Sequence, residues 1–217
     1  MPYFTTIFFD LDDTLYPGGN GLWDAIRGRM GRYMWERLGL PKEDVPALRR
    51  SYYKTYGTTL RGLQIHHRVD VDDYLDYVHA VPLENYLQPA PELHGMLLSL
   101  PQGKWVFTNA DANHARRVIT VLGIGDCFEG IIDIRANAFN CKPEAVAYQT
   151  ALALAGERDP RRCVLLDDSP GNLAPARQMG FTTVLVGQTR SDPAATCSIE
   201  NLLALRQALP ELWNGMG

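Results

Sequence analysis

Polar residues capable of chemistry stand next to apolar runs at four places in this sequence. Residues 10–14 (DLDDT) follow one apolar run, Thr108 and Asn109 end a second, and Asp167 and Asp168 end a third. Lys142 stands just before a proline, between the second and third runs. Two like charges repel by about 4 kcal/mol when they lie roughly 4 Å apart at an effective dielectric constant of about 20. Acids that converge from these places therefore need a lysine, a proton or a divalent cation beside them.

The acidic side chains offer oxygen ligands only. Asp10, Asp12, Asp167 and Asp168 have no cysteine or histidine among them, and such a donor set favours a hard cation, with Mg²⁺ the first choice. A divalent cation together with Lys142 would bring the cluster close to neutrality. A phosphate group could approach a neutralised cluster of this kind, whereas bare carboxylates would repel it.

The apolar runs are typical of strands that are buried on both faces of a parallel sheet. They cover residues 5–9, 104–108, 163–167 and 182–186. Helical stretches alternate with them at residues 112–122, 143–155 and 170–179. This alternation predicts an α/β fold, a doubly wound Rossmann-like parallel sheet with right-handed crossovers. Because ligands bind at the carboxyl ends of the strands in such sheets, we expect the four polar groups to meet there.

Residues 17–88 interrupt the alternation of strands and helices. The segment has no convincing strand, and apolar residues recur on one helical face, as at Leu22, Ile26, Met30 and Tyr33. Two further helices are expected at residues 45–56 and 71–81. Turn-forming stretches at residues 17–21 and 88–91 are the expected hinges. We predict a core domain formed by residues 1–16 and 89–217, and an all-α domain, residues 17–88, inserted after the first strand.

Composition excludes several classes of partner. The 217 residues carry 21 Lys and Arg against 25 Asp and Glu, a formal net charge of -4, so neither nucleic acid nor a membrane surface is expected as a partner. The apolar runs are shorter than the ~20 residues of a membrane span. The beginning of the chain does not resemble a secretory signal, and the four cysteines are widely scattered. We expect a cytoplasmic protein that is a monomer or a homodimer.

In their order and context, residues 10–14, Thr108, Lys142 and residues 167–168 resemble the four motifs of the haloacid dehalogenase (HAD) superfamily of phosphohydrolases. The resemblance extends from the first strand to about Val186. It implies that Asp10 is the nucleophile that becomes an aspartyl-phosphate. It also implies that Asp12 protonates the leaving oxygen and then activates water. An acid two residues after the nucleophile favours phosphoryl transfer over dehalogenation or the reaction of a P-type pump.

The same resemblance implies roles for the remaining residues of the motifs. Thr108 and Asn109 would bind the phosphoryl oxygens. Lys142 would keep Asp10 ionised and offset the charge of the phosphoryl group. Asp167 and Asp168 would complete a Mg²⁺ site together with Asp10 and the main-chain carbonyl of Asp12. The implied substrate is a small-molecule phosphate ester.

The inserted segment resembles the helical cap domain of one branch of the superfamily. Leu15 and Tyr16 after the first motif, residues 56–63 (YGTTLRGL) and residues 107–110 (FTNA) resemble the pyrimidine 5′-nucleotidase subgroup. This resemblance implies nucleoside monophosphates as substrates, pyrimidine nucleotides in particular. Arg61 and Tyr56 would then contribute to substrate specificity from the cap.

Other functions fit the same motifs. A phosphosugar phosphatase or mutase of the superfamily would share the aspartyl-phosphate intermediate, and nothing in the insert favours it. A phosphate-binding regulatory protein would not need all four of Asp10, Asp12, Lys142 and Asp168. A receiver-like signalling domain with a phosphorylated aspartate is disfavoured by the large insert. A phosphomonoesterase is therefore the leading hypothesis.

Overall fold

The computed structural model describes residues 4–213. The chain divides into two compact units, one formed by Met1–Gly18 with Leu87–Gly217 and the other by Gly19–Tyr86. We call them the core unit and the helical unit. Each boundary lies two residues inside the insert predicted from the sequence.

The core unit contains a six-stranded sheet, and every neighbouring pair of its strands is parallel. The strand order is β3-β2-β1-β4-β5-β6. The strands are β1 (Thr6–Phe9), β2 (Gly103–Phe107), β3 (Gly130–Ile132), β4 (Cys163–Asp167), β5 (Thr182–Val186) and β6 (Cys197–Ile199). This arrangement confirms the predicted doubly wound α/β fold. The sequence prediction missed β3 and β6, because runs of three residues are too short to show a period.

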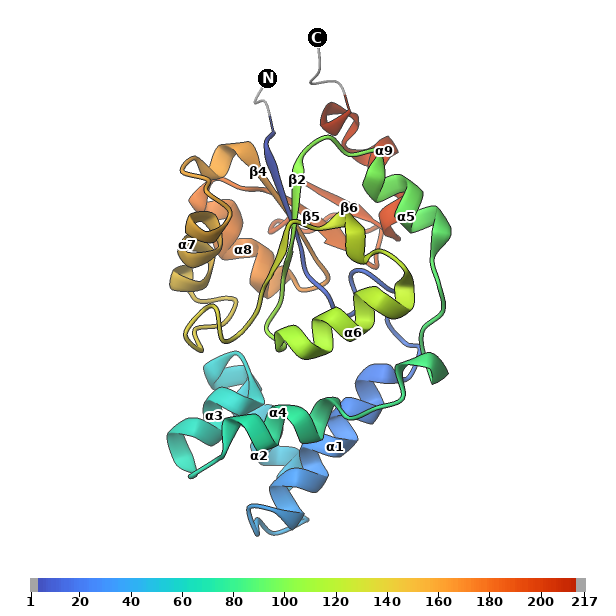
Figure 1. Cartoon of the computed structure of the whole chain (residues 1–217). Helices are drawn as coiled ribbons and strands as arrows, with labels where there is room; N and C mark the ends of the chain where they lie inside the picture. Colours follow the sequence, from blue (N-terminus) through green and yellow to red (C-terminus); the bar gives the residue numbers. More distant parts are fainter. Residues whose placement is uncertain (1–3, 214–217) are drawn as a thin grey trace. The chain divides into compact units, whose positions relative to one another are not determined.

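Helices cover both faces of this sheet (Figure 1), with α7 and α8 on one side and α5, α6 and α9 on the other. They are α5 (Pro91–Leu98), α6 (Ala112–Leu122), α7 (Ala145–Leu154), α8 (Pro170–Met179) and α9 (Leu205–Ala208). Short 3-10 turns lie at Leu83–Asn85, Gly125–Cys127, Pro160–Arg162, Leu202–Ala204 and Pro210–Leu212. Helix α7 begins at Ala145 rather than at Pro143, since the backbone of Glu144 is extended.

Alternate residues of the central strands pack beneath α7 and α8. Phe8 of β1 and Phe107 of β2 form an edge-to-face aromatic pair with ring centroids 6.1 Å apart. Tyr148 of α7 packs against Phe107 with the rings at 5.7 Å. These side chains are at most 1% exposed. The packing fixes the central strands, and therefore the backbone from which the polar residues at their carboxyl ends project.

The helical unit, Gly19–Tyr86, contains four α-helices, the 3-10 turn Leu83–Asn85 and no strand. The helices are α1 (Leu22–Glu36), α2 (Val45–Tyr56), α3 (Thr59–His66) and α4 (Val71–His79). Helices α1 and α4 pack through Tyr33 and Tyr74, whose rings cross edge to face at 5.1 Å. Helix α4 ends two residues before the predicted end at Val81, and the eight-residue α3 was not predicted.

Across residues 4–213, no helix has both the length and the apolar character that a membrane crossing requires.

Candidate active site

The central strands bring Asp10 and Asp167 to the same edge of the sheet. Asp10 directly follows β1, and Asp167 is the last residue of the neighbouring strand β4. The main-chain N–H of Asp10 donates to the carbonyl of Leu166 at 2.9 Å, which continues the pairing of the two strands to their carboxyl ends. Thr108 follows β2 on the other side of β1. The residues therefore meet at the edge where open α/β sheets bind their ligands.

Lys142 joins the two acids. Its Nζ donates to Oδ1 of Asp10 at 2.7 Å, to Oδ2 of Asp167 at 2.7 Å and to the carbonyl of Phe107 at 2.8 Å. The residue is only 1% exposed. Burial lowers the pKa of the Lys142 ammonium, but Asp10 and Asp167 outweigh burial, so the pKa lies above its usual range. Lys142 thus stays cationic, and all three of its donors are engaged.

Three carboxylates lie close enough to share one cation. Ligand oxygens of Asp10, Asp167 and Asp168 all lie within 4.8 Å of one another, not far above the roughly 4 Å that separates opposite ligands of an octahedral Mg²⁺. Three carboxylates against the single ammonium of Lys142 leave two negative charges uncompensated. An all-oxygen donor set with this excess charge fits Mg²⁺ in both chemistry and charge.

Burial and the neighbouring negative charges raise the pKa values of two of these acids. Burial raises the pKa of Asp10 well above its usual range; Lys142 opposes this shift, and Asp167 and Asp168 add to it. Asp168 is the most accessible of the three. Burial, followed by the charges of Asp167 and Asp13, raises the pKa of Asp168 to about 7. A cation bound among these carboxylates would lower both pKa values.

The loop after β4 fixes the carboxyl group of Asp167. Its Oδ1 accepts hydrogen bonds from the main-chain N–H of Ser169 and from Nδ2 of Asn172, each at 2.9 Å. Asn172 is held in turn, because its carbonyl accepts the hydroxyl of Tyr148 at 2.6 Å. Asp167 is fully buried. These bonds orient Asp167 towards Lys142, while Asp10 and Asp168 complete the group of potential metal ligands.

Asn109 connects the loop after β2 to Lys142. Its Oδ1 accepts the main-chain N–H of Lys142, and its Nδ2 donates to the carbonyl of Lys142, both at 2.9 Å. The amide of Asn109 therefore braces the loop that carries Lys142. Thr108 is 2% exposed, and its Oγ1 accepts the main-chain N–H of Ala110 at 3.0 Å. The predicted contacts of Thr108 and Asn109 with phosphoryl oxygens remain predictions.

The side chain of Asp12 has partners that sequence reasoning did not assign. Its Oδ1 accepts the hydroxyl of Tyr16 at 2.5 Å and lies 3.0 Å from Nε2 of His114 in α6. The metal role predicted for Asp12 involves its main-chain carbonyl, and its carboxyl group is engaged by these two side chains. The only sequence signal for His114 was its place on the apolar face of α6, which also fits an ordinary core residue.

Arg61 and Tyr56, the residues predicted to determine specificity, belong to the helical unit. Arg61 lies in the first turn of α3, and its main-chain N–H donates to Oγ1 of Thr58, the N-cap residue. The hydroxyl of Tyr56 lies 2.7 Å from Nε2 of His66. Among the other aromatic residues of this unit, Tyr33 and Tyr52 are buried, whereas Tyr53 is 60% exposed.

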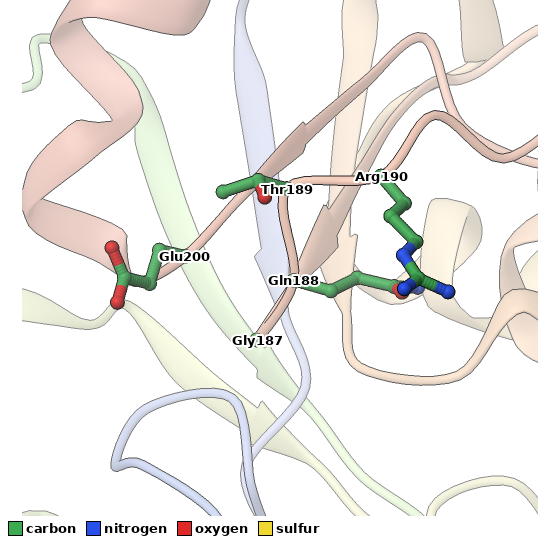
Figure 2. Close-up of a pocket in the computed structure, with 5 residues that line it drawn as sticks. All are labelled: Gly187, Gln188, Thr189, Arg190 and Glu200. Carbon is green, nitrogen blue, oxygen red and sulfur yellow. The ribbon is translucent and has the colours of Figure 1, made fainter.

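A cavity of about 440 Å³ lies at the carboxyl ends of β5 and β6, on the side of the sheet beyond β4. It is lined by the loop that follows β5, residues 187–190, and by Glu200 after β6. Figure 2 shows the side chains of Gln188 and Arg190 extending to one side and Glu200 to the other. None of the predicted site residues is among those that line this cavity.

Comparison with known proteins identifies the class to which this fold and site belong. Residues 4–180 match the family of haloacid dehalogenase-like hydrolases. The chain therefore belongs to this family, which confirms the superfamily predicted from the four motifs. The pyrimidine 5′-nucleotidase subgroup remains a prediction.

Individual proteins support the same class. Phosphate metabolism protein 8 of Saccharomyces cerevisiae is 30% identical over 192 residues; the match covers 82% of this chain, which spans 60% of the length of that relative. The HAD phosphatase from Thermococcus onnurineus has a TM-score of 0.64 at 18% identity, with 94% of this chain and 96% of that chain covered. The putative HAD-hydrolase YfnB from Bacillus subtilis, solved bound to magnesium, has a TM-score of 0.60 at 14% identity, with 94% and 98% covered. The two solved structures establish the fold alone.

Proposed function

We propose that this hydrolase is a Mg²⁺-dependent phosphomonoesterase that acts through an aspartyl-phosphate on nucleoside monophosphates. The observation that carries the proposal is the cluster at the carboxyl ends of β1 and β4. There Lys142 bridges Asp10 and Asp167 at 2.7 Å, and Asp168 lies with them within 4.8 Å. Asp12, the proposed general acid and base, lies two residues after Asp10 and contacts Tyr16 and His114, which lie outside this cluster.

The proposed reaction has two steps. An oxygen of Asp10 attacks the phosphorus atom, the bond from phosphorus to the ester oxygen breaks, and Asp12 donates a proton to the departing oxygen. Asp12 then takes a proton from a water molecule, whose oxygen attacks the phosphorus of the aspartyl-phosphate. Cleavage of the acyl phosphate releases inorganic phosphate and restores both acids to their initial states.

The remaining residues would bind and neutralise the phosphoryl group. Mg²⁺ held by Asp10, Asp168, Asp167 and the Asp12 carbonyl would supply positive charge to the phosphoryl oxygens. Lys142 holds one oxygen of Asp10 and thereby directs the other towards phosphorus. Thr108 and the backbone of Asn109 would contact the phosphoryl oxygens. Since the amide of Asn109 braces Lys142, its side chain would act mainly by fixing the loop.

The proposal that the substrates are nucleotides rests on the sequence. Residues 56–63 and 107–110 resemble those of the pyrimidine 5′-nucleotidases. The yeast relative, phosphate metabolism protein 8, is also named for phosphate metabolism. We propose that the helical unit serves as a cap that selects the leaving group, with Arg61 and Tyr56 among the residues that contact the nucleoside.

A panel of substrates tests the proposed reaction. We expect phosphate release from UMP and CMP, and more slowly from AMP, glucose 6-phosphate and p-nitrophenyl phosphate, with loss of activity in EDTA and recovery in Mg²⁺. Asp10→Asn should lower kcat by about a thousandfold or more with an unchanged circular dichroism spectrum. Full activity of this variant would overturn the assignment of the nucleophile.

Two alternatives are separated by their products. A phosphosugar mutase would convert a hexose 1-phosphate to the 6-phosphate in the presence of a hexose bisphosphate, without net phosphate release. A dehalogenase would release halide from a 2-haloacid. Turnover of either kind without hydrolysis of phosphate esters would replace the proposed activity.

Arg61→Ala tests the proposed cap. We expect a larger loss of kcat/KM for UMP than for p-nitrophenyl phosphate, because the smaller ester offers no nucleoside to contact. Arg50→Ala, at an exposed position of the adjacent helix α2, is the matched control and should change neither value. Equal losses for the two esters would remove Arg61 from substrate recognition.

A further inference from the structure

The carboxyl group of Asp12 lies against two side chains from different parts of the core unit. The hydroxyl of Tyr16 donates to its Oδ1 at 2.5 Å, and Nε2 of His114 lies 3.0 Å from the same oxygen. The side chain of His114 is 0% exposed, and that of Asp12 is 14% exposed. A buried histidine 102 residues away in the sequence is thus aimed at the residue proposed as the acid and base.

The backbone of α6 determines where His114 lies. The main-chain N–H of His114 donates to Oδ1 of Asp111, the N-cap residue of the helix, at 3.0 Å. The N–H of Ala112 donates to Oδ2 of the buried Asp133 at 2.9 Å. These two bonds fix the first turn of α6. Because α6 begins just after the loop that carries Thr108, the same turn links the proposed acid to the proposed phosphoryl-binding loop.

Both donors use the same oxygen of Asp12. Rotation about the bond from Cβ to Cγ exchanges the two oxygens of a carboxyl group, so an unrestrained acid has no fixed oxygen for proton transfer. Hydrogen bonds from Tyr16 and His114 to Oδ1 prevent that exchange. With Oδ1 held in this way, Oδ2 would be the oxygen that passes the proton. A well-oriented acid is worth more in catalysis than a mobile one, since its orientation need not be fixed during the reaction.

We propose that His114 is a positioning residue for Asp12, assisted by Tyr16, and this inference rests on the phosphomonoesterase function proposed above. In this role Nε2 of His114 carries a hydrogen and donates it to Oδ1 of Asp12, because the proton that Asp12 transfers is on Oδ2. The proton on Oδ2 moves to the ester oxygen as its bond to phosphorus breaks. His114 contacts neither the substrate nor the reacting atoms, so its effect is confined to steps in which Asp12 transfers a proton.

The test compares two leaving groups in His114→Leu. The parameter kcat/KM covers the steps up to departure of the leaving group, in which an alkyl ester needs a proton from Asp12 and p-nitrophenolate does not. We expect kcat/KM to fall by about 10- to 100-fold for the best alkyl ester of the panel. For p-nitrophenyl phosphate we expect a fall of no more than about threefold, because only the general-acid contribution is lost.

Rescue distinguishes positioning from packing. The amide nitrogen of His114→Gln reaches about as far as Nε2, so this variant should recover most of the loss with the alkyl ester. Tyr16→Phe removes the second donor and should shift the ratio of the two kcat/KM values in the same direction. Val118→Ala, at another fully buried position of α6, is the control. It should lower the melting temperature and leave the ratio unchanged.

Each outcome bears on one of the two proposals. Equal losses for both esters in a folded His114→Leu, no loss, or no recovery in His114→Gln would overturn the positioning role and leave the phosphatase function standing. A wild-type protein that hydrolyses neither ester would overturn the proposed function and, with it, the role of His114 in catalysis. A selective loss that His114→Gln restores would establish the proposal.

Discussion

At the scale of single residues, Lys142 neutralises part of the negative charge of the carboxylate cluster. It is a buried cation whose three donors contact two carboxylates and one carbonyl. Buried ion pairs of this kind contribute little net stability when complete, but removal of one partner leaves an uncompensated buried charge. Lys142 therefore couples the integrity of the fold to that of the site.

Lys142→Met measures this coupling. We expect the variant to lose about 3–5 kcal/mol in the free energy of unfolding at pH 7, because Asp10 and Asp167 lose their shared cation. Urea denaturation in the presence of EDTA checks the value. Lys54→Met, at an exposed position of α2, is the control and should stay within about 0.5 kcal/mol of wild type. A Lys142 variant as stable as the control would contradict the account.

The raised pKa of Asp168 predicts that the stability of the folded chain depends on pH. Its pKa of about 7 in the folded chain lies above the ordinary value of 3.8, so ionisation of Asp168 disfavours the folded state. The penalty is absent below about pH 4, grows as the pH rises towards 7 and is complete above pH 7. In EDTA, Asp168→Asn should therefore raise the melting temperature at pH 8 and have little effect at pH 4.

Thermal denaturation at the two pH values measures the difference. Asp76→Asn, at an exposed position of α4, controls for the general loss of one negative charge. The pKa assigned to Asp168 is wrong if the Asp168 and Asp76 variants show the same dependence on pH.

At the scale of elements, close packing in the helical unit depends on a glycine. A Cβ atom at Gly62 of α3 would lie 2.3 Å from Cγ of Tyr52 in α2. Gly62 therefore allows the two helices to approach. A Cβ atom at Gly28 of α1 would have no neighbour within 4 Å. Packing therefore does not require a glycine at this position.

Alanine substitutions at these two glycines should have opposite effects. Gly62→Ala should lower the free energy of unfolding by about 1–3 kcal/mol through overpacking. Gly28→Ala should raise it by about 0.5–1 kcal/mol, because alanine is the better helix former. Chemical denaturation monitored by far-ultraviolet circular dichroism tests both. Stabilisation by Gly62→Ala would mean that α2 and α3 are not in the contact described.

At the scale of the whole molecule, the site links ligand binding to stability. The carboxylate cluster belongs to the folded core unit and is dispersed in the unfolded chain. A cation that binds only the folded state stabilises it by about 2.7 kcal/mol at a concentration one hundred times its Kd. Stability should consequently depend on the concentration of Mg²⁺.

Titration with MgCl₂ tests this linkage. We expect the melting temperature of the wild type to rise with MgCl₂ beyond the effect of NaCl at equal ionic strength. Asp168→Asn should show a much smaller rise, since it removes one ligand and one negative charge. An identical response of the variant and the wild type would place the cation elsewhere.

The sequence by itself determined the fold class and the position of the acidic motifs at the carboxyl ends of the strands. The bounds of α2, α8, β4 and β5 agree with the predicted ranges. Each of the two helices has a proline in its first turn and a glycine after its last, and the two strands are continuous runs of mostly apolar residues. Parallel strands then require Asp10 and Asp167 to emerge at one edge. The local pattern therefore predicts that the acids lie at the same ends of the strands, and the tertiary structure gives the strand order that makes β1 and β4 neighbours.

Only the tertiary structure decided which side chains hold the acids. His114 and Asp12 lie 102 residues apart and meet because α6 packs beside the strands, a long-range contact that no local period encodes. The same holds for the bracing of Lys142 by Asn109, and for the burial of Tyr33 while Tyr53 stays exposed. Residue type and spacing specify which groups approach the site; packing between distant segments selects the atoms that bond.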